Sequence, residues 1–203
     1  MAENPWDLLD EQLETEHDVE EEDIETIDPV VQQRPHRLRG VQPVDRANQL
    51  GRFDASDVST LAWFIGVHGG SGASTVTGWS REGANSEHRW PEQSKDPVFL
   101  VARTNTKGLR AAQSALKDWA SGEISVAVSG LILVADSPGK LPRILREEIT
   151  RLSGLVPEIL RVPWVEDLRV EIDADAVPSP RPITKLITRL QARTPENGAQ
   201  RDA

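Results

Sequence analysis

The chain has 203 residues, of which 33 are acidic and 23 are Lys or Arg, so its formal net charge is −10. Only 37% of the residues are apolar, below the roughly 45–50% of a typical globular chain, so we expect one ordinary domain with tails or two very small domains. The lack of cysteine excludes a disulfide scaffold, a thiol nucleophile and a cysteine-based metal site.

The first 30 residues account for the acidic balance. They hold 13 acidic residues and no Lys or Arg, whereas the other 173, with 20 acids and 23 bases, carry +3. Burial of the few apolar groups in this stretch would not offset the conformational entropy that is lost when a chain becomes ordered. We therefore expect a disordered acidic tail over residues 1–30. Because residues 31–203 carry a net charge of only +3, we do not expect direct binding to nucleic acid.

A short amphipathic stretch lies at the start of this tail. Trp6, Leu9 and Leu13 share one face of a helix that Asn4 and Pro5 would begin. This spacing predicts a docking helix for a protein partner. The alternative is a nascent helix on a solubilising tail.

Two more segments are predicted to lie outside the core. Residues 31–57 mix prolines, glycines and scattered charges without a sustained period, which is typical of a linker. Residues 58–192 are expected to form the folded body, and residues 193–203 a disordered C-terminal tail. An acidic start without an apolar core is no secretory signal, and no apolar run reaches the roughly 18 residues of a membrane helix. We therefore expect a cytoplasmic protein that does not bind membranes.

The body begins with a continuous apolar run over residues 61–67, followed by glycines. Similar runs occur at 97–102 and 130–135, and a weaker one at 158–162. Continuous runs of this length predict strands that are buried on both faces of a sheet.

Helical patterns separate and follow these strands. Apolar residues recur at three and four positions over residues 109–119, 141–152 and 183–190. Strands alternating with helices predict an α/β fold, a parallel sheet with helices on both faces. In such sheets the ligand site lies where the carboxyl ends of the strands open into loops. These loops are residues 68–74, 103–106, 136–140 and 163–167.

The glycine-rich segment after the first strand is the principal candidate site. Glycines let backbone amides approach an anion, and a helix start adds its positive dipole end. Strand, glycine turn and helix therefore predict a phosphate cradle, composed of Gly69, Gly70, Ser71, Gly72, Ala73, Ser74 and Thr75.

This segment resembles the deviant P-loop of the ParA/MinD group of ATPases, whose pattern is Lys-Gly-Gly-x-Gly-Lys-[Ser/Thr]-Thr. The three glycines match, and Ser74 and Thr75 match the two hydroxyl positions. His68 and Ala73 stand where the two lysines belong, so both cations are missing. The resemblance implies that Ser74 would touch a metal only if a magnesium nucleotide binds, and no other metal ligand is expected.

The resemblance extends over residues 61–167. Asp136 stands where that group places an adenine-contacting Asn; it could read a nucleobase or cap the helix that starts near Leu141. Only 21 residues, Val76 to Asp96, separate the loop from the next strand, and the polar stretch 81–88 is predicted to be a loop. No Walker B aspartate is visible there.

The layout also resembles an uncharacterised actinobacterial family found near conjugative and mobile-element genes. Together the resemblances imply a catalytically degenerate P-loop-like binding or assembly protein that serves a mobile or conjugative element and weakly holds ATP, another nucleotide or a phosphate without hydrolysis. Two alternatives stay open: a weak or partner-activated ParA/MinD-like ATPase, and a ligand-free scaffold acting through its acidic tail. No catalytic residue is expected; His68 is interpreted as a loop residue with a satisfied ring nitrogen, and Trp79, Trp90, Trp119 and Trp164 as packing anchors.

Overall fold

The computed structural model describes residues 49–171 and 173–193. Its centre is a five-stranded sheet in which every neighbouring pair is parallel. In spatial order the strands are β3 (Ala84–Asn85), β2 (Trp63–Gly66), β5 (Val98–Arg103), β6 (Val128–Val134) and β7 (Ile159–Val162).

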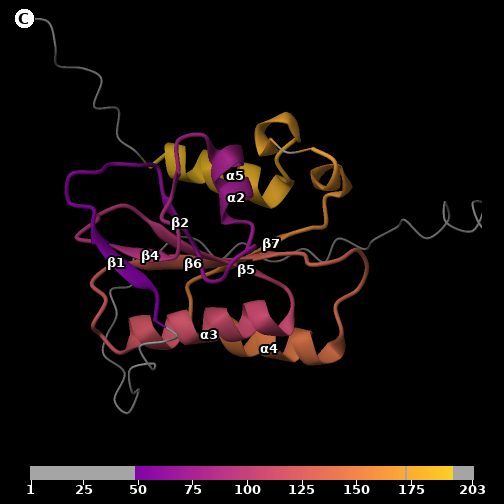
Figure 1. Ribbon diagram of the computed structural model, residues 1–203, viewed down its shortest axis with the longest axis horizontal. Coiled ribbons are helices and arrows are strands. Elements are labelled where there is room, and N and C mark those ends of the chain that lie inside the picture. The colour runs from indigo at the N-terminus through magenta and orange to yellow at the C-terminus, as the bar shows by residue number, and fades with distance from the viewer. Residues whose placement is uncertain (1–48, 172, 194–203) are drawn as a thin grey trace, which may run out of the picture.

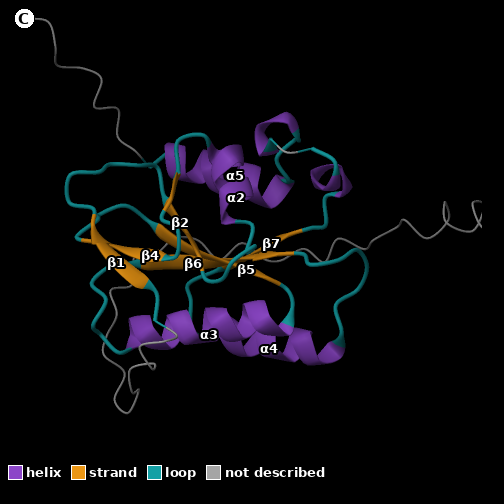
Figure 2. Ribbon diagram, viewed as in Figure 1, coloured by secondary structure: helices purple, strands orange, loops and turns teal. Residues whose placement is uncertain are grey.

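Helices cover both faces of this sheet (Figure 1 and Figure 2). One layer holds α3 (Thr106–Ala120) and α4 (Arg143–Ser153), and the other holds α2 (Ala73–Ser80) and α5 (Arg181–Gln191). The α/β fold class and the parallel sheet expected from the alternating pattern are therefore confirmed. Between β7 and α5 lie two 3-10 helices, Glu166–Arg169 and Ala174–Ala176.

The continuous apolar runs are explained by burial on both faces. All seven residues of β6 are buried, as are five of the six residues of β5. Alternate side chains point to opposite faces of a strand, so each run supplies two cores. Leu100 and Leu131 pack on the α3/α4 side, while Phe99 and Ile132 pack on the α2/α5 side.

A second, two-stranded sheet corrects the predicted linker. β1 (Gly51–Asp54) pairs in parallel with β4 (Arg89–Glu92), and Ala55 just after it is buried. Phe53 packs edge-to-face on Trp63 with ring centroids 5.5 Å apart. The last part of the 31–57 segment thus belongs to the folded body. The local sequence pattern did not predict this strand, because the strand that pairs with it lies far along the chain.

The stretch expected to be a loop at residues 81–88 also contains structure. β3 lies within it and β4 begins directly after it, so the interval before β5 holds the end of a helix and two short strands. β3 pairs with β2 through only two residues. An edge strand of this length carries no recognisable period, because period-2 alternation needs at least four residues.

Of the four tryptophans expected to be packing anchors, three are buried, which confirms their packing role: Trp79, Trp90 and Trp119. Trp164 is only partly buried, and its indole N–H donates to Glu166. Buried indole N–H groups need acceptors, and the three find them in Val177 O at 3.0 Å, Asp118 Oδ2 at 3.2 Å and Val126 O at 2.9 Å.

The acidic tail with Trp6, Leu9 and Leu13, the linker up to residue 48 and residues 194–203 lie outside the described residues. Within the described ranges, no helix combines the length and the apolar character that crossing a membrane requires.

Candidate functional site

The glycine loop connects β2 to α2 at the carboxyl edge of the sheet. Gly70 has φ 73° and Gly72, which precedes the first residue of α2, has φ 94°. Both values lie in the left-handed region that favours glycine. A Cβ at Gly72 would come within 3.2 Å of the Val134 side chain, whereas one at Gly69 or Gly70 would meet no described atom within 4 Å. The loop is therefore tight on its core side and open on its outer side.

Two backbone amides of the loop are satisfied internally. The N–H of Ser71 donates to the carbonyl oxygen of His68 at 3.2 Å, and the N–H of Ala73 donates to Ser71 Oγ at 3.3 Å. The N–H groups of Gly70, Gly72 and Ser74 find no acceptor among the described residues. Free amides beside a helix start are the donors that an anion needs.

His68 is held by both of its ring nitrogens. Nδ1 donates to the carbonyl oxygen of Gly69 at 2.8 Å, which leaves Nε2 to accept from the backbone N–H of Arg103 at 3.1 Å. This pattern requires the neutral imidazole with its proton on Nδ1. The interpretation of His68 as a loop residue with satisfied nitrogens is confirmed; it ties the glycine loop to β5.

Arg103, the last residue of β5, brings a cation to the loop. Its Nε donates to the carbonyl oxygen of Gly70 at 3.2 Å, and its guanidinium also donates to the carbonyl oxygen of Ala135 at 2.6 Å. It forms no ion pair with any residue in the described ranges. One half-buried guanidinium thus joins the ends of β5 and β6 to the glycine loop.

Sequence reasoning did not single out Arg103 as a site residue. The available signal was a charged residue placed directly after the buried run 98–102, at the edge where ligand loops converge. Its significance depends on Gly70 and Ala135, which lie 33 and 32 residues away.

Asp136 lies in the neighbouring loop and has a different partner from the one expected. Its Oδ1 accepts from Asn105 Nδ2 at 2.9 Å, and the side chain of Asn105 caps α3 by accepting from the N–H of Gly108 at 2.8 Å. Helix α4 instead begins after Pro142. The predicted capping of that helix by Asp136 is therefore wrong, because the carboxylate supports the cap of α3.

Ser74 and Thr75 occupy the first turn of α2. Ser74 is exposed and its Oγ accepts from Asn85 Nδ2 at 3.1 Å, which links the loop to β3. Asn85 thus places a neutral amide next to the Ser74 hydroxyl, whereas a tightly held Mg²⁺ would favour a carboxylate there. Among the described residues there is no group of three or more His, Asp or Glu side chains that could hold a metal ion.

The structure therefore brings the seven predicted loop residues and the Asp136 loop to one edge, and it adds Arg103 and Asn85. The arrangement offers backbone N–H donors and one cation on an open surface. Its chemistry is suited to holding a small anion.

A family model matches residues 59–183, from just before β2 to the start of α5, and its description is "Family of unknown function (DUF6668)". The match includes the whole glycine loop, Arg103 and Asp136. No curated protein and no solved structure matches the chain significantly.

Proposed function

We propose a function for this chain, which belongs to the family of unknown function DUF6668: it is a catalytically degenerate P-loop-like protein that binds a phosphate group, free or as part of a nucleotide, and does not hydrolyse it. It then acts by binding or assembly rather than by catalysis. The single observation that carries the proposal is the open glycine loop, where the amides of Gly70, Gly72 and Ser74 find no acceptor among the described residues and lie beside the Arg103 guanidinium.

The contacts of Arg103 support an anion at this place. Two of its donors already hold the carbonyl oxygens of Gly70 and Ala135, so the guanidinium has a defined position without any ligand. A positioned cation costs less entropy on binding than a free side chain does. Arg103 would supply the charge that the missing P-loop lysines supply in the ParA/MinD group.

The same loop argues against turnover. The side chain of Ala73 is buried with the apolar residues between the sheet and α2, so it offers no donor to a β- or γ-phosphate. Asn85 contacts the Ser74 hydroxyl, and neither β3 nor β4 carries an aspartate. Each charge-assisted contact that is lost removes roughly 1.5–3 kcal/mol, and those that stabilise developing charge determine the rate.

The finer part of the proposal rests on resemblance. The order of strand, glycine loop and helix is similar to the ParA/MinD layout, and the resembling actinobacterial proteins are found near conjugative and mobile-element genes. We propose that the chain serves such an element as a binding or assembly component. A ligand-free scaffold is the competing function, and the same binding experiment separates the two.

The experiment is titration of the full chain with fluorescently labelled ATP and with pyrophosphate. Gly70→Val and Gly139→Val form a matched pair, because both glycines have positive φ and open space around the Cβ position. Only Gly70 lies in the cradle, so Gly70→Val should weaken binding by at least about tenfold, the equivalent of one charge-assisted contact. Gly139→Val should leave the affinity unchanged.

Ala73→Lys tests the dead-site argument. The restored ammonium should tighten ATP binding if its stem can run from the core to the loop, while phosphate release should stay at background. Release by the unchanged chain above about 10⁻² s⁻¹, the rate of a slow NTPase, would contradict the proposal. If neither the unchanged chain nor Ala73→Lys binds ATP or pyrophosphate, the loop is only a turn and the scaffold function is favoured.

A further inference from the structure

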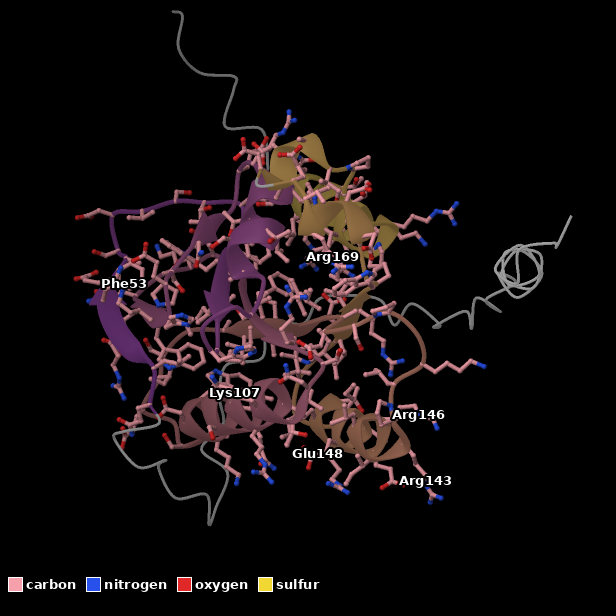
Figure 3. The ribbon with its side chains drawn as sticks, turned by 45° about the vertical axis from the view of Figure 1, so that its right-hand side comes forward. Phe53, Lys107, Arg143, Arg146, Glu148 and Arg169 are labelled. Atoms are coloured by element: carbon pink, nitrogen blue, oxygen red, sulfur yellow. The ribbon has the colours of Figure 1, made fainter. Side chains whose placement is uncertain are left out.

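Helices α3 and α4 carry several exposed basic side chains that form no ion pair within the described part of the chain. On α3 the exposed cations are spaced so that they share one face of the helix. Figure 3 labels Lys107 on α3 and Arg143 and Arg146 on α4. We define the basic face by the exposed cations of these two helices that form no ion pair with another described residue: Lys107, Arg110, Lys117 and Arg146.

The acidic side chains of these two helices do not balance the basic face. Glu147 is paired with Arg143 at 2.8 Å, and Glu148 is paired with Arg151 at 3.2 Å. Asp118, the acidic residue of α3, is buried. Ile144 adds an apolar side chain to the outer surface of α4, with 68% of its area exposed. The surface therefore combines uncompensated positive charge with an apolar contact point.

We propose that the basic face is the docking surface for the acidic segment 14–28 of the same chain. That segment contains nine acidic residues and no Lys or Arg. It also contains Val19, Ile24 and Ile27, which could contact Ile144. No other segment of the chain has this charge density, so charge complementarity selects it as the occupant.

The entry point of the described chain lies on the same side of the sheet. Leu50 and Phe53 pack against the core beneath α3 and α4, and Arg52 pairs with Glu123, just after α3, at 3.3 Å. The 20 residues 29–48 could span at most about 72 Å, and α3 is only about 22 Å long. The covalent connection therefore lets the acidic segment reach every cation of the basic face.

The covalent link also determines whether weak ion pairs are enough to hold the acidic segment on the basic face. A single exposed ion pair contributes too little to hold two separate chains together. Within one chain the effective concentration reaches the millimolar range, so several such pairs acting together suffice. Contacts of this kind are screened by salt, because the Debye length falls from about 10 Å at 0.1 M to about 3 Å at 1 M.

The absence of native cysteine makes a direct test possible. A spin label on Val19→Cys in the full-length chain would be the sole label, and amide signals would report which residues it approaches. We expect loss of signal intensity at exposed residues of α3 and α4, and none on α5. The loss should disappear at 1 M salt. It should not change when the labelled protein is diluted tenfold, because a contact within one chain does not depend on protein concentration.

Matched charge reversals identify the surface. Arg110→Glu with Lys117→Glu removes two cations of the basic face, and Lys95→Glu with Lys185→Glu changes the same charge at exposed positions outside it. The first pair should abolish the signal loss, and the second should leave it intact. Replacing Glu20, Glu21, Glu22 and Asp23 by Gln, Gln, Gln and Asn should also abolish it without altering the folded body.

Three results would overturn the inference. One is signal loss centred on Arg34, Arg37 and Arg39 without loss on α3 or α4, which would place the acidic segment on the linker arginines. Another is a loss that disappears on dilution, which would make a second copy the occupant. The third is an equal effect of both charge-reversal pairs.

Discussion

The carboxyl edge of the central sheet and the corner formed by β1, β4 and the end of α3 both place polar side chains against the core. At the edge, the side chains of His68 and Arg103 hydrogen-bond to main-chain atoms of the loops, and the side chain of Asn105 accepts from the main chain of α3. At the corner, Asp118 is buried with Trp90 Nε1 donating to one oxygen, and its other oxygen has no partner within the described part of the chain.

The difference concerns what is left unpaired. At the edge, His68 and Asn105 have hydrogen-bond partners, and the backbone amides of Gly70, Gly72 and Ser74, which find no acceptor among the described residues, lie on an open surface where a ligand can reach them. At the corner the unpaired atom is a carboxylate oxygen that is closed off from solvent. Burial raises the pKa of Asp118 above its ordinary value, and the Trp90 hydrogen bond only partly opposes this. The edge therefore keeps its unpaired donors within reach of solvent, whereas the buried carboxylate of the corner carries a cost in stability.

The largest expected effect is at the corner. Trp90→Ala should lower the free energy of unfolding by about 3–5 kcal/mol, because it leaves a cavity at a fully buried position. Urea titration of the full chain measures this. Trp90→Phe keeps most of the volume and removes the N–H, so it should cost less; an equal cost for both variants would show that the hydrogen bond to Asp118 is the larger contribution.

At the edge, Arg103→Met should have a smaller effect on stability and a larger one on binding. It keeps the apolar stem but removes the donors to Gly70 and Ala135, at a cost of about 1–3 kcal/mol. Thermal unfolding measures the first effect and pyrophosphate titration the second. Arg103→Lys restores the charge alone; recovery of binding without recovery of stability would separate the two roles. Unchanged binding in Arg103→Met would remove Arg103 from the proposed site.

Asn105→Ala should destabilise the chain by about 1 kcal/mol through loss of the α3 cap. Asp136→Ala removes only the carboxylate that supports Asn105, so its cost should be smaller. Asn105→Ser retains a capping hydroxyl and is the control. Comparison of the three melting temperatures would contradict this order if Asp136→Ala were the most destabilising.

The smallest effect has the opposite sign. Asp118→Asn should raise the free energy of unfolding at neutral pH, by less than about 1 kcal/mol, because it removes a buried charge and keeps an acceptor for Trp90. The raised pKa means that the folded chain binds the proton more tightly, so the stability of the unchanged chain falls as pH rises from the ordinary value through the folded value. The gain from Asp118→Asn should therefore shrink as pH falls through this range in denaturant titrations. A gain independent of pH would contradict the buried charge as its cause.

The elements that the sequence predicted share one property: their signal is local. The runs at 97–102 and 130–135 are apolar because both of their faces are covered, and β5 and β6 lie where those runs predicted strands. The glycine loop was predictable for the same reason. Gly70 and Gly72 have positive φ, a backbone conformation that glycine favours, so the residue type itself indicates the turn.

The composition alone also separated the acidic segment of nine charges from a nearly balanced body. Periodicity alone determined the parallel α/β class, because alternating strands and helices leave few connections that bury both faces of a sheet. These conclusions depend on each residue and its near neighbours in the chain, so one sequence suffices for them.

Only the tertiary structure decided which residues meet. β1 becomes a strand because β4 pairs with it, Arg103 becomes part of the site because Gly70 and Ala135 accept from it, and Asp136 supports α3 rather than α4. Each of these contacts joins residues about 30 or more positions apart. No local pattern encodes such contacts, because their free energy arises only after the rest of the chain has brought the two partners together.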